Sequence, residues 1–308
     1  MLQIDFINIG YGDAVLVRTK TFSMLVDTGG PDPDDHGTGR IDAASFLKSQ
    51  GIEHLDLLVL THPHSDHVGG APELIDEIPV DELWTNYSPP AGTSGRQVYI
   101  DPAWEDPTAS LFKSLNDVSL VVNSLVKKSC VIKVCDSDQF VKKIDGLEIT
   151  AIPAARALTE KQKEVFNTAF EKVDFAAVRD FAGSINAAGI CLVLKYKNRT
   201  VVLPADLGAN LLEQYHFGGC DIFKVPHHGA EDALTPGLLD TAKAKHIVFS
   251  VSNDRAKVDG RPFPDIVQMA LDSGASIYFT DAVAYRDRPV KIHSSVHFEI
   301  DEEIKIIE

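Results

Sequence analysis

Short apolar runs alternate with polar turns along most of the chain, a pattern typical of an α/β protein. Strands are predicted in the first 60 residues at 2–9, 14–18, 23–26 and 55–60. The last of these runs is apolar except for Asp56, as expected of a strand buried on both faces. A helix is predicted over 42–50, because apolar residues recur there at helical spacing and Gly51 follows in a terminating position.

The middle of the chain is less regular. Residues 87–106 are rich in Pro and Gly and have no clear period, and an amphipathic helix is predicted over about 108–127. We then predict a strand pair at 129–134 and 147–152, with the turn between them at 136–138. Residues 158–181 are charged and have helical spacing, which indicates an excursion packed over the surface.

The last third repeats a strand followed by a polar loop. A hairpin is predicted from 190–196 and 200–203, and further strands are predicted at 222–225, 247–251 and 277–279. No composition shift marks a linker. We therefore expect a single domain over 1–308, built from two mixed β-sheets packed face to face with helices outside, in which loops at one sheet edge form a shared cleft.

The composition is that of an ordinary globular protein, with 44% hydrophobic and 24% charged residues. No run approaches the roughly 18 apolar residues of a membrane span. The N-terminus lacks the basic start and apolar stretch of a secretory signal, so we expect a cytoplasmic protein. The four cysteines lack the paired spacing of zinc ribbons, and we expect them to be reduced and buried.

The formal net charge of −16 opposes nonspecific attraction to nucleic acid, which depends on clustered Lys and Arg. A polyanion would need a local basic strip or a bound partner, and the sequence identifies no protein partner. Part of the negative charge can surround bound cations, which the formal count omits.

The strongest chemical signal is the segment Thr61-His62-Pro63-His64-Ser65-Asp66-His67, which follows the predicted buried strand and holds three of the chain's 11 histidines. Two imidazoles two residues apart can converge on one cation from an extended loop, while the Asp-His pair beyond them can turn toward a second. Imidazole and carboxylate ligands suit zinc, manganese, iron or cobalt, and the absence of a nearby thiolate argues against a closed structural zinc site.

This segment resembles the HxHxDH signature of the metallo-β-lactamase superfamily, whose fold is an αββα sandwich. The resemblance implies an Asp at an earlier strand end that braces the loop without binding metal, and Asp27 in Leu-Val-Asp-Thr-Gly-Gly fits it. It also implies a bridging Asp at a later strand end, and Asp206 in Val-Val-Leu-Pro-Ala-Asp fits that position.

Within the superfamily, the chain resembles most the nuclease-type domain of ComEC competence proteins and related phosphodiesterases such as phosphorylcholine esterase. The likeness rests on four stretches, which are Gly10-Tyr11-Gly12-Asp13-Ala14, Ser184-Ile185-Asn186, Lys224-Val225-Pro226-His227-His228-Gly229-Ala230, and 250–253 followed by Pro264. Tyr11 and Ala230 depart from the commoner Gln and Ser. The likeness covers nearly the whole chain, and insertions at about 87–138 and 156–181 are its least family-like parts.

The resemblance implies two divalent metal ions, Zn or Mn. Superfamily hydrolases usually carry a further histidine between the signature and the bridging Asp, yet residues 68–205 contain none. The first ion would then have only His62, His64 and Asp206, which leaves positions open for water and substrate. The second would have Asp66, His67, Asp206 and, by resemblance to the esterase, His228. His227 would hold a phosphoryl oxygen or protonate the leaving group.

The candidate catalytic residues are therefore Asp66, Asp206 and His227. Asp13 is a candidate to support the ligands from behind, and Asn186 is a candidate to line the cleft. We expect no catalytic role for the remaining histidines, which are His36, His54, His216, His246, His293 and His297. The acidic residues Asp32, Asp34 and Asp35 can bind calcium but are more typical of a solvated turn.

Hydrolysis is the expected chemistry, because two cations roughly 3.5–4 Å apart can lower the pKa of a bridging water to give hydroxide at neutral pH. The narrower resemblance favours a phosphodiester substrate in DNA, RNA or a smaller molecule. Two alternatives remain open. One is a hydrolase for a thioester, lactone or other acyl substrate, and the other is a regulatory module whose metal site is not catalytic.

Overall fold

The computed structural model describes residues 1–31, 38–90, 96–100, 107–172, 175–254, 260–283 and 291–307. The proposed acidic turn at Asp32, Asp34 and Asp35 and the neighbouring His36 lie outside these residues. So do 91–95 and 101–106 of the first expected insertion and 173–174 of the second.

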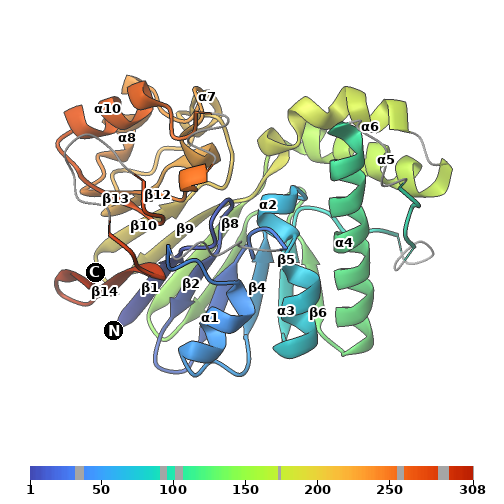
Figure 1. Cartoon of the computed structure of the whole chain (residues 1–308), viewed down its shortest axis with the longest axis horizontal. Coiled ribbons are helices and arrows are strands. Elements are labelled where there is room, and N and C mark those ends of the chain that lie inside the picture. Colours follow the sequence, from blue (N-terminus) through green and yellow to red (C-terminus); the bar gives the residue numbers. More distant parts are fainter. Residues whose placement is uncertain are drawn as a thin grey trace.

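The first sheet has the strand order β15-β14-β1-β2-β3-β4-β5-β6. Strands β3 to β6 run parallel, and the remaining neighbours are antiparallel. The bounds are β1 Leu2–Ile7, β2 Val15–Arg18, β3 Ser23–Val26, β4 Leu57–Leu60, β5 Glu82–Thr85, β6 Val131–Val134, β14 Ser295–Ile300 and β15 Ile304–Ile307. The two ends of the chain thus lie side by side in this sheet, as Figure 1 shows.

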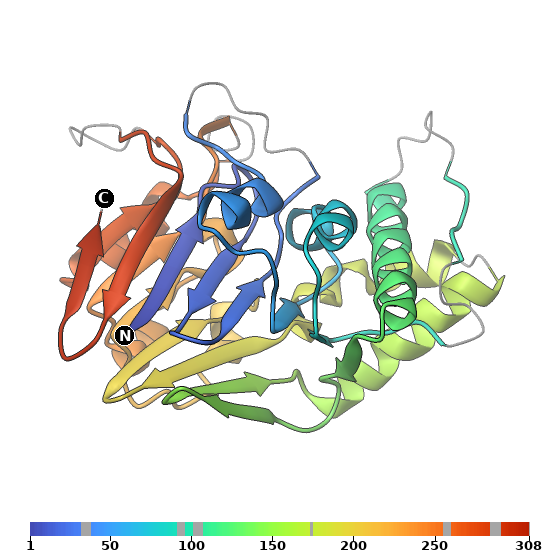
Figure 2. The same ribbon diagram turned by 90° about the horizontal axis from the view of Figure 1, so that it is seen from below.

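The second sheet has the order β13-β12-β11-β10-β9-β8-β7. Strands β10 to β13 are parallel, whereas β7 to β10 form an antiparallel meander. The bounds are β7 Phe140–Ile144, β8 Leu147–Ile152, β9 Cys191–Tyr196, β10 Arg199–Leu203, β11 Ile222–Lys224, β12 His246–Phe249 and β13 Ser276–Phe279. Both sheets are mixed, and Figure 2 shows them as separate layers.

Helices cover both outer faces of the paired sheets. The bounds are α1 Ala43–Ser49, α2 Ser65–Val68, α3 Ala71–Glu77, α4 Pro107–Lys127, α5 Arg156–Lys172, α6 Phe175–Phe181, α7 Ala209–Leu212, α8 Pro236–Ala242 and α10 Pro264–Asp272, with 3-10 turns at Ala182–Ser184, Asn186–Ala188 and Pro226–Gly229. Figure 1 shows α8 and α10 on one side of the sheets and α1 and α3 on the other. The predicted αββα arrangement is confirmed.

The apolar patterning explains these layers. In β4, Leu57 and Val59 belong to the core between the sheets, whereas Leu58 and Leu60 belong to the core under the helices. Because both faces of β4 are buried, its sequence is a continuous apolar run. A third core joins the outer face of the second sheet to α7, α8 and α10.

One predicted feature is wrong. The segments 129–134 and 147–152 do not pair, because β6 pairs with β5 in the first sheet and β8 pairs with β7 and β9 in the second. The turn at 136–138 instead carries the chain from one sheet to the other. Strand β7 was missed because Lys142 and Lys143 interrupt its short alternation of apolar and polar residues.

The remaining predicted elements lie close to the observed ones. Helix α1 begins after Asp42, whose side chain accepts a hydrogen bond from the Ser45 N–H, as an N-cap residue does. All four cysteines are buried and unpaired. Within the described residues, no helix has both the length and the apolar character needed to cross a membrane.

Glu82 at the start of β5 joins the two sheets. Its carboxylate accepts hydrogen bonds from the Trp84 indole at 2.7 Å and from Lys142 of β7 at 2.5 Å, and it pairs with Lys133 of β6 at 2.6 Å. Burial opposes ionisation of Glu82, but the two lysines outweigh it and lower its pKa to about 2. The carboxylate therefore stabilises the fold in its ionised form.

We expect Glu82→Gln to lower the free energy of unfolding by roughly 1–3 kcal/mol at neutral pH, because hydrogen bonds to a charged group are lost. The folded-state pKa lies below the ordinary value of 4.5, so this stabilisation is present above 4.5 and disappears as the pH falls toward 2. Urea unfolding at several pH values measures it. Glu160→Gln, which removes an exposed pair with Arg156, is the matched control and should have little effect. An equal deficit at neutral and acidic pH would contradict this role.

Candidate metal centre

The HxHxDH segment crosses the end of β4 and enters the short helix α2, so its side chains leave the backbone in different directions. His62 and His64 lie on the extended part, and their Nε2 and Nδ1 atoms are 3.1 Å apart. Asp66 and His67 lie in the first turns of α2. This change of backbone conformation separates the four side chains into two pairs.

Asp206 belongs to both of two groups of converging ligand atoms. The first group is His62, His64 and Asp206, and the second is Asp66, His67, Asp206 and His228; the ligand atoms of each group lie within 4.8 Å of one another. In the second group, the Nε2 atoms of His67 and His228 lie 3.3 Å and 3.7 Å from the two Asp206 oxygens. In the first group, the His62 Nε2 atom lies 3.9 Å from the Oδ2 atom of Asp206.

Three of these atoms have no hydrogen-bond partner among the described residues although they are buried. They are the Nε2 atoms of His67 and His228 and the Oδ1 atom of Asp206. Each such group costs about 1–3 kcal/mol if it stays unsatisfied. A bound cation would satisfy all three, so the residues fit divalent metal ions with nitrogen and oxygen ligands.

The three buried imidazoles are each held from behind, which fixes the ring nitrogen that faces the centre. The Nδ1 atom of His62 contacts the Thr61 hydroxyl at 3.1 Å, that of His67 contacts Asp27 at 2.8 Å, and that of His228 contacts the Ser250 carbonyl at 3.0 Å. Partners of this kind commonly orient metal-ligating histidines. In each ring the Nε2 atom therefore faces Asp206.

Asp27, predicted to brace the loop, contacts both ends of the HxHxDH segment. It lies at the end of β3 with φ of 57°, and it accepts hydrogen bonds from the Thr61 N–H at 2.8 Å and the Thr61 hydroxyl at 2.7 Å. With the contact to His67, one carboxylate ties β3 to both ends of the HxHxDH segment. Burial raises its pKa, although the charge of His67 opposes the rise.

Asp13 reaches the centre because the turn before it touches the HxHxDH segment. Its N–H donates to the Asp66 carbonyl at 3.0 Å, and its Oδ1 atom lies 3.7 Å from the Nδ1 atom of His228. Gly12 has φ of +133°, and a Cβ atom there would lie 2.1 Å from the Asp66 carbonyl oxygen. Only glycine permits this close approach.

Lys224 lies at the candidate centre, although sequence reasoning gave it no role. It is buried in β11, its ammonium group contacts the Asp13 carboxylate, and it lies 3.9 Å from the Oδ1 atom of Asp206. A lysine in an otherwise apolar buried strand was the available signal, because a buried charge needs a partner. It offsets one of the four carboxylates that line the centre, so a net excess of negative charge remains for cations to balance.

The ionisation of the site follows from this crowding. Burial opposes ionisation of Asp66 and Asp206, but the neighbouring imidazoles, chiefly His228 for Asp66 and His67 for Asp206, hold both pKa values below the ordinary range. Burial also lowers the pKa of His62 and of His64, which therefore stay neutral and available as ligands. In His67, burial is outweighed by Asp206 and Asp27, which raise its pKa well above the ordinary value. The carboxylates thus attract positive charge to the position of the second group.

His227 belongs to neither of the two groups. Its Nδ1 atom lies 3.0 Å from the Asp232 carboxylate and its Nε2 atom 3.2 Å from the Asn186 amide nitrogen, and 20% of its side chain is exposed. Asp232 was missed by sequence reasoning, and its only signal was an acidic residue shortly after the histidine pair. His227 and His228 both have positive φ, at 50° and 54°, as does Ala205 at 53°. Such strained backbone clusters at functional sites.

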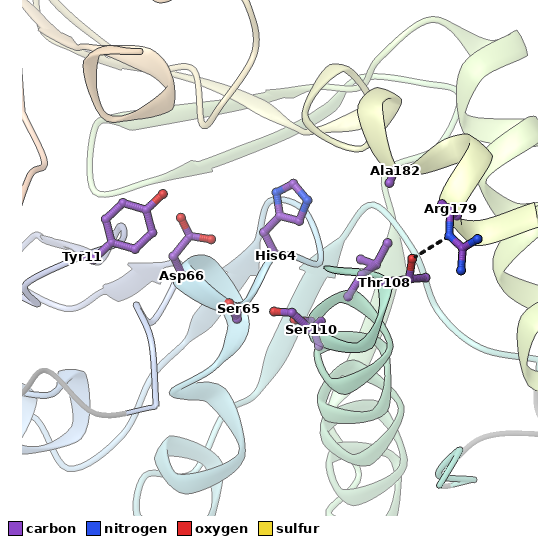
Figure 3. Close-up of a pocket in the computed structure, with 10 residues that line it drawn as sticks. Tyr11, His64, Ser65, Asp66, Thr108, Ser110, Arg179 and Ala182 are labelled. Carbon is purple, nitrogen blue, oxygen red and sulfur yellow. Dashed lines mark hydrogen bonds between the residues drawn. The ribbon is translucent and has the colours of Figure 1, made fainter. Parts of the chain in front are cut away.

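A cleft of about 560 Å³ opens over the centre, and His64 and Asp66 line its floor. Figure 3 shows Tyr11 beside Asp66 at one end and Thr108 with Arg179 at the other. The Tyr11 ring lies 5.0 Å from the ring of His228, and its hydroxyl accepts a hydrogen bond from Arg261 at 2.8 Å. The centre is therefore accessible to a small molecule.

The other described histidines lie outside both groups. His54 is exposed and pairs with Asp81, His246 contacts Tyr278, His293 contacts the Phe279 carbonyl, and His297 contacts Asp5. His216 is exposed.

Comparison with known proteins relates part of this chain to a protein family. Residues 7–153 match the model described as the metallo-beta-lactamase superfamily. The chain is 33% identical over 93 residues to ComE operon protein 3 of Bacillus subtilis, covering 26% of this chain and 12% of that protein. It is 30% identical over 146 residues to Recombination protein 2 of Haemophilus influenzae, covering 45% and 17%. The matches thus span less than a fifth of either relative's length.

A solved structure agrees on the fold. The metallo-beta-lactamase fold protein YhfI of Bacillus subtilis superposes with a TM-score of 0.51 at 11% identity, covering 97% of this chain and all of that one (100%). The resemblance expected from the HxHxDH signature is thereby confirmed. Residues 7–153 therefore match the metallo-beta-lactamase superfamily, whose members are typically metal-dependent hydrolases, and the chain shares the metallo-beta-lactamase fold.

Proposed function

We propose that this chain is a metal-dependent phosphodiesterase. The observation that carries the proposal is the Asp206 carboxylate, which is shared by two converging sets of nitrogen and oxygen atoms beneath an open cleft. We assign His62, His64 and Asp206 to one divalent ion and Asp66, His67, Asp206 and His228 to a second. Zinc and manganese both suit these ligands.

When bound, two such ions supply Lewis acidity and activate water as a nucleophile. The protein's own part is to hold and shield the reacting groups. Asp206 lies 3.3 Å from His67 and Asp66 lies 3.2 Å from His228, and Asp27 and Ser250 prevent these two rings from turning. Pre-positioning of this kind lowers the barrier because no reorganisation is needed during the reaction.

His227 is our candidate for contact with the leaving group or a phosphoryl oxygen. It lies next to the ligand His228 in sequence, it is partly exposed, and Asp232 orients its ring. Asn186 adds an amide beside it, and the Oδ1 atom of that amide is buried with no partner among the described residues. These polar groups suit a substrate that presents several oxygens.

Two observations support a phosphodiester substrate over an acyl substrate. Residues 68–205 supply no additional histidine, so the first group has three protein ligands and keeps positions open for substrate oxygen. The four stretches that carry the resemblance to ComEC-type domains adjoin the candidate centre. Tyr11 lines the cleft, Asn186 contacts His227, and the Ser250 carbonyl contacts the ring of His228. Nucleic acid or a smaller phosphodiester is the corresponding partner.

We also propose that residues 1–308 form one domain. The core between the sheets combines Leu2 and Phe298, from the two ends of the chain, with Leu147 and Leu192 from its middle. Neither sheet could bury its inner face without the other.

Three substrates separate the candidate functions. Purified protein with added manganese or zinc should hydrolyse bis-p-nitrophenyl phosphate, and single-stranded DNA is the polymeric comparison. Preference for a thioester would identify an acyl hydrolase. Two bound ions per chain without turnover of any substrate would identify a regulatory module.

We expect Asp206→Ala to reduce phosphodiester hydrolysis by at least about a thousandfold, as removal of an essential catalytic group does. Both ligand groups lose their common member, so metal content should fall as well. Elemental analysis, steady-state kinetics and circular dichroism measure the three properties. Asp240→Ala, which removes an exposed carboxylate from α8, is the control. A folded Asp206→Ala protein with wild-type activity would show that the assigned site is wrong.

The roles of the paired histidines can be separated. We expect His228→Ala to lose about one metal ion per chain, since it removes a ligand of the second group. His227→Ala should keep both ions but lose activity by about a hundredfold or more, the usual scale for a proton-transfer group. Exposed His216→Ala is the control. The reverse outcome, with metal loss only in His227→Ala, would exchange the two roles.

A further inference from the structure

We infer that the cleft wall formed by α4 and α6 binds the distal end of the substrate, and that this end carries hydroxyl groups and an anion. The inference rests on the proposed phosphodiesterase function and narrows its substrate class. The substrate is then a small phosphodiester of about two linked units, with a second anionic group beyond the scissile bond, rather than a long nucleic acid.

The cleft continues well past the proposed metal ligands. Figure 3 shows Asp66 and His64 toward one end, and Thr108, Arg179 and Ala182 toward the other, with Ser110 between. A substrate with its scissile phosphodiester at Asp66 and His64 therefore extends along α4. The side chains of this wall therefore indicate which chemical groups the substrate presents to it.

The wall is rich in hydroxyl groups. Thr108, Ser110 and Ser114 of α4 line it, and Leu111 of α4 and Ala182, which directly follows α6, add apolar contacts. Hydroxyls both donate and accept hydrogen bonds, so they suit sugar-like hydroxyls and ester oxygens. The mixed surface is typical of a small-molecule pocket, in which a few polar groups fix the orientation of the ligand.

Arg179 places a positive charge at the far end. It lies in the last turn of α6, its Nε atom donates to the Thr108 hydroxyl at 3.5 Å, and it is exposed at the rim. The first turn of α4 begins beside it at Pro107, and the positive end of the helix dipole there adds to the attraction. A guanidinium can bind a phosphate or carboxylate through two parallel hydrogen bonds.

Size and charge favour a small substrate over a polymer. A volume of about 560 Å³ is within the range for a single small ligand. Among the described residues that line the cleft, Arg179 is the one cation. A polynucleotide would need several such contacts to overcome repulsion by a chain of net charge −16.

The test compares a dinucleotide that carries a terminal phosphate, at its 5′ or 3′ end, with the same dinucleotide lacking it. We expect Arg179→Ala to raise KM for one phosphorylated isomer about tenfold with kcat nearly unchanged. KM for the unphosphorylated dinucleotide and for bis-p-nitrophenyl phosphate should change by less than about twofold. Arg179→Lys, which keeps the charge, should restore part of the loss.

Lys113→Ala is the matched control, because it removes an exposed cation from α4 that does not line the cleft. Equal effects of Arg179→Ala on phosphorylated and unphosphorylated dinucleotides would overturn the inference. So would a lower KM of the wild type for a long single-stranded oligonucleotide than for either phosphorylated dinucleotide. If the wild type cleaves bis-p-nitrophenyl phosphate but no dinucleotide, the subsite is wrong and the phosphodiesterase remains. If the metal-loaded protein does not cleave bis-p-nitrophenyl phosphate, both the subsite and the proposed phosphodiesterase function are wrong.

Discussion

A buried carboxylate shared by several cation-binding groups is the constraint on which this site depends. Asp206 is 2% exposed and lies among His62, His67 and His228, with Lys224 beyond them. Such a charge is costly to bury unless opposite charges surround it. Loops after β4, β10 and β11 must therefore meet at one edge, and the face-to-face packing of the two sheets brings them there.

The surrounding fold supports this arrangement at a cost in backbone strain. Ala205, His227 and His228 all adopt left-handed conformations that non-glycine residues normally avoid. The Ala205 carbonyl accepts hydrogen bonds from Lys224 at 3.4 Å and from the His227 N–H at 3.3 Å. These hydrogen bonds hold Asp206 and the histidine pair close together despite the strain, and the sheets behind them supply the necessary stability.

The sequence predicted the layered fold and the converging His and Asp residues, because apolar periodicity and a dense motif are local signals. It did not predict the partners of β6 and β8, since pairing depends on which sheet a strand joins and not on its own residues. The roles of Lys224, Asp232 and Arg179 were not predicted, for a similar reason. Each makes its contact with a residue elsewhere in the sequence, and a single polar residue in a sequence does not reveal such a contact.

The floor and the wall of the cleft come from different parts of the chain. The cleft floor, with His64 and Asp66, comes from the HxHxDH segment, whereas α4 and α6 lie in the two segments that we expected from the sequence to be the least family-like. The residues proposed to act on the scissile bond thus lie on short loops that the two sheets hold in place. Under the proposed function, selectivity would depend on helices packed outside the first sheet, where Thr108 and Arg179 can change without disturbing the buried charges.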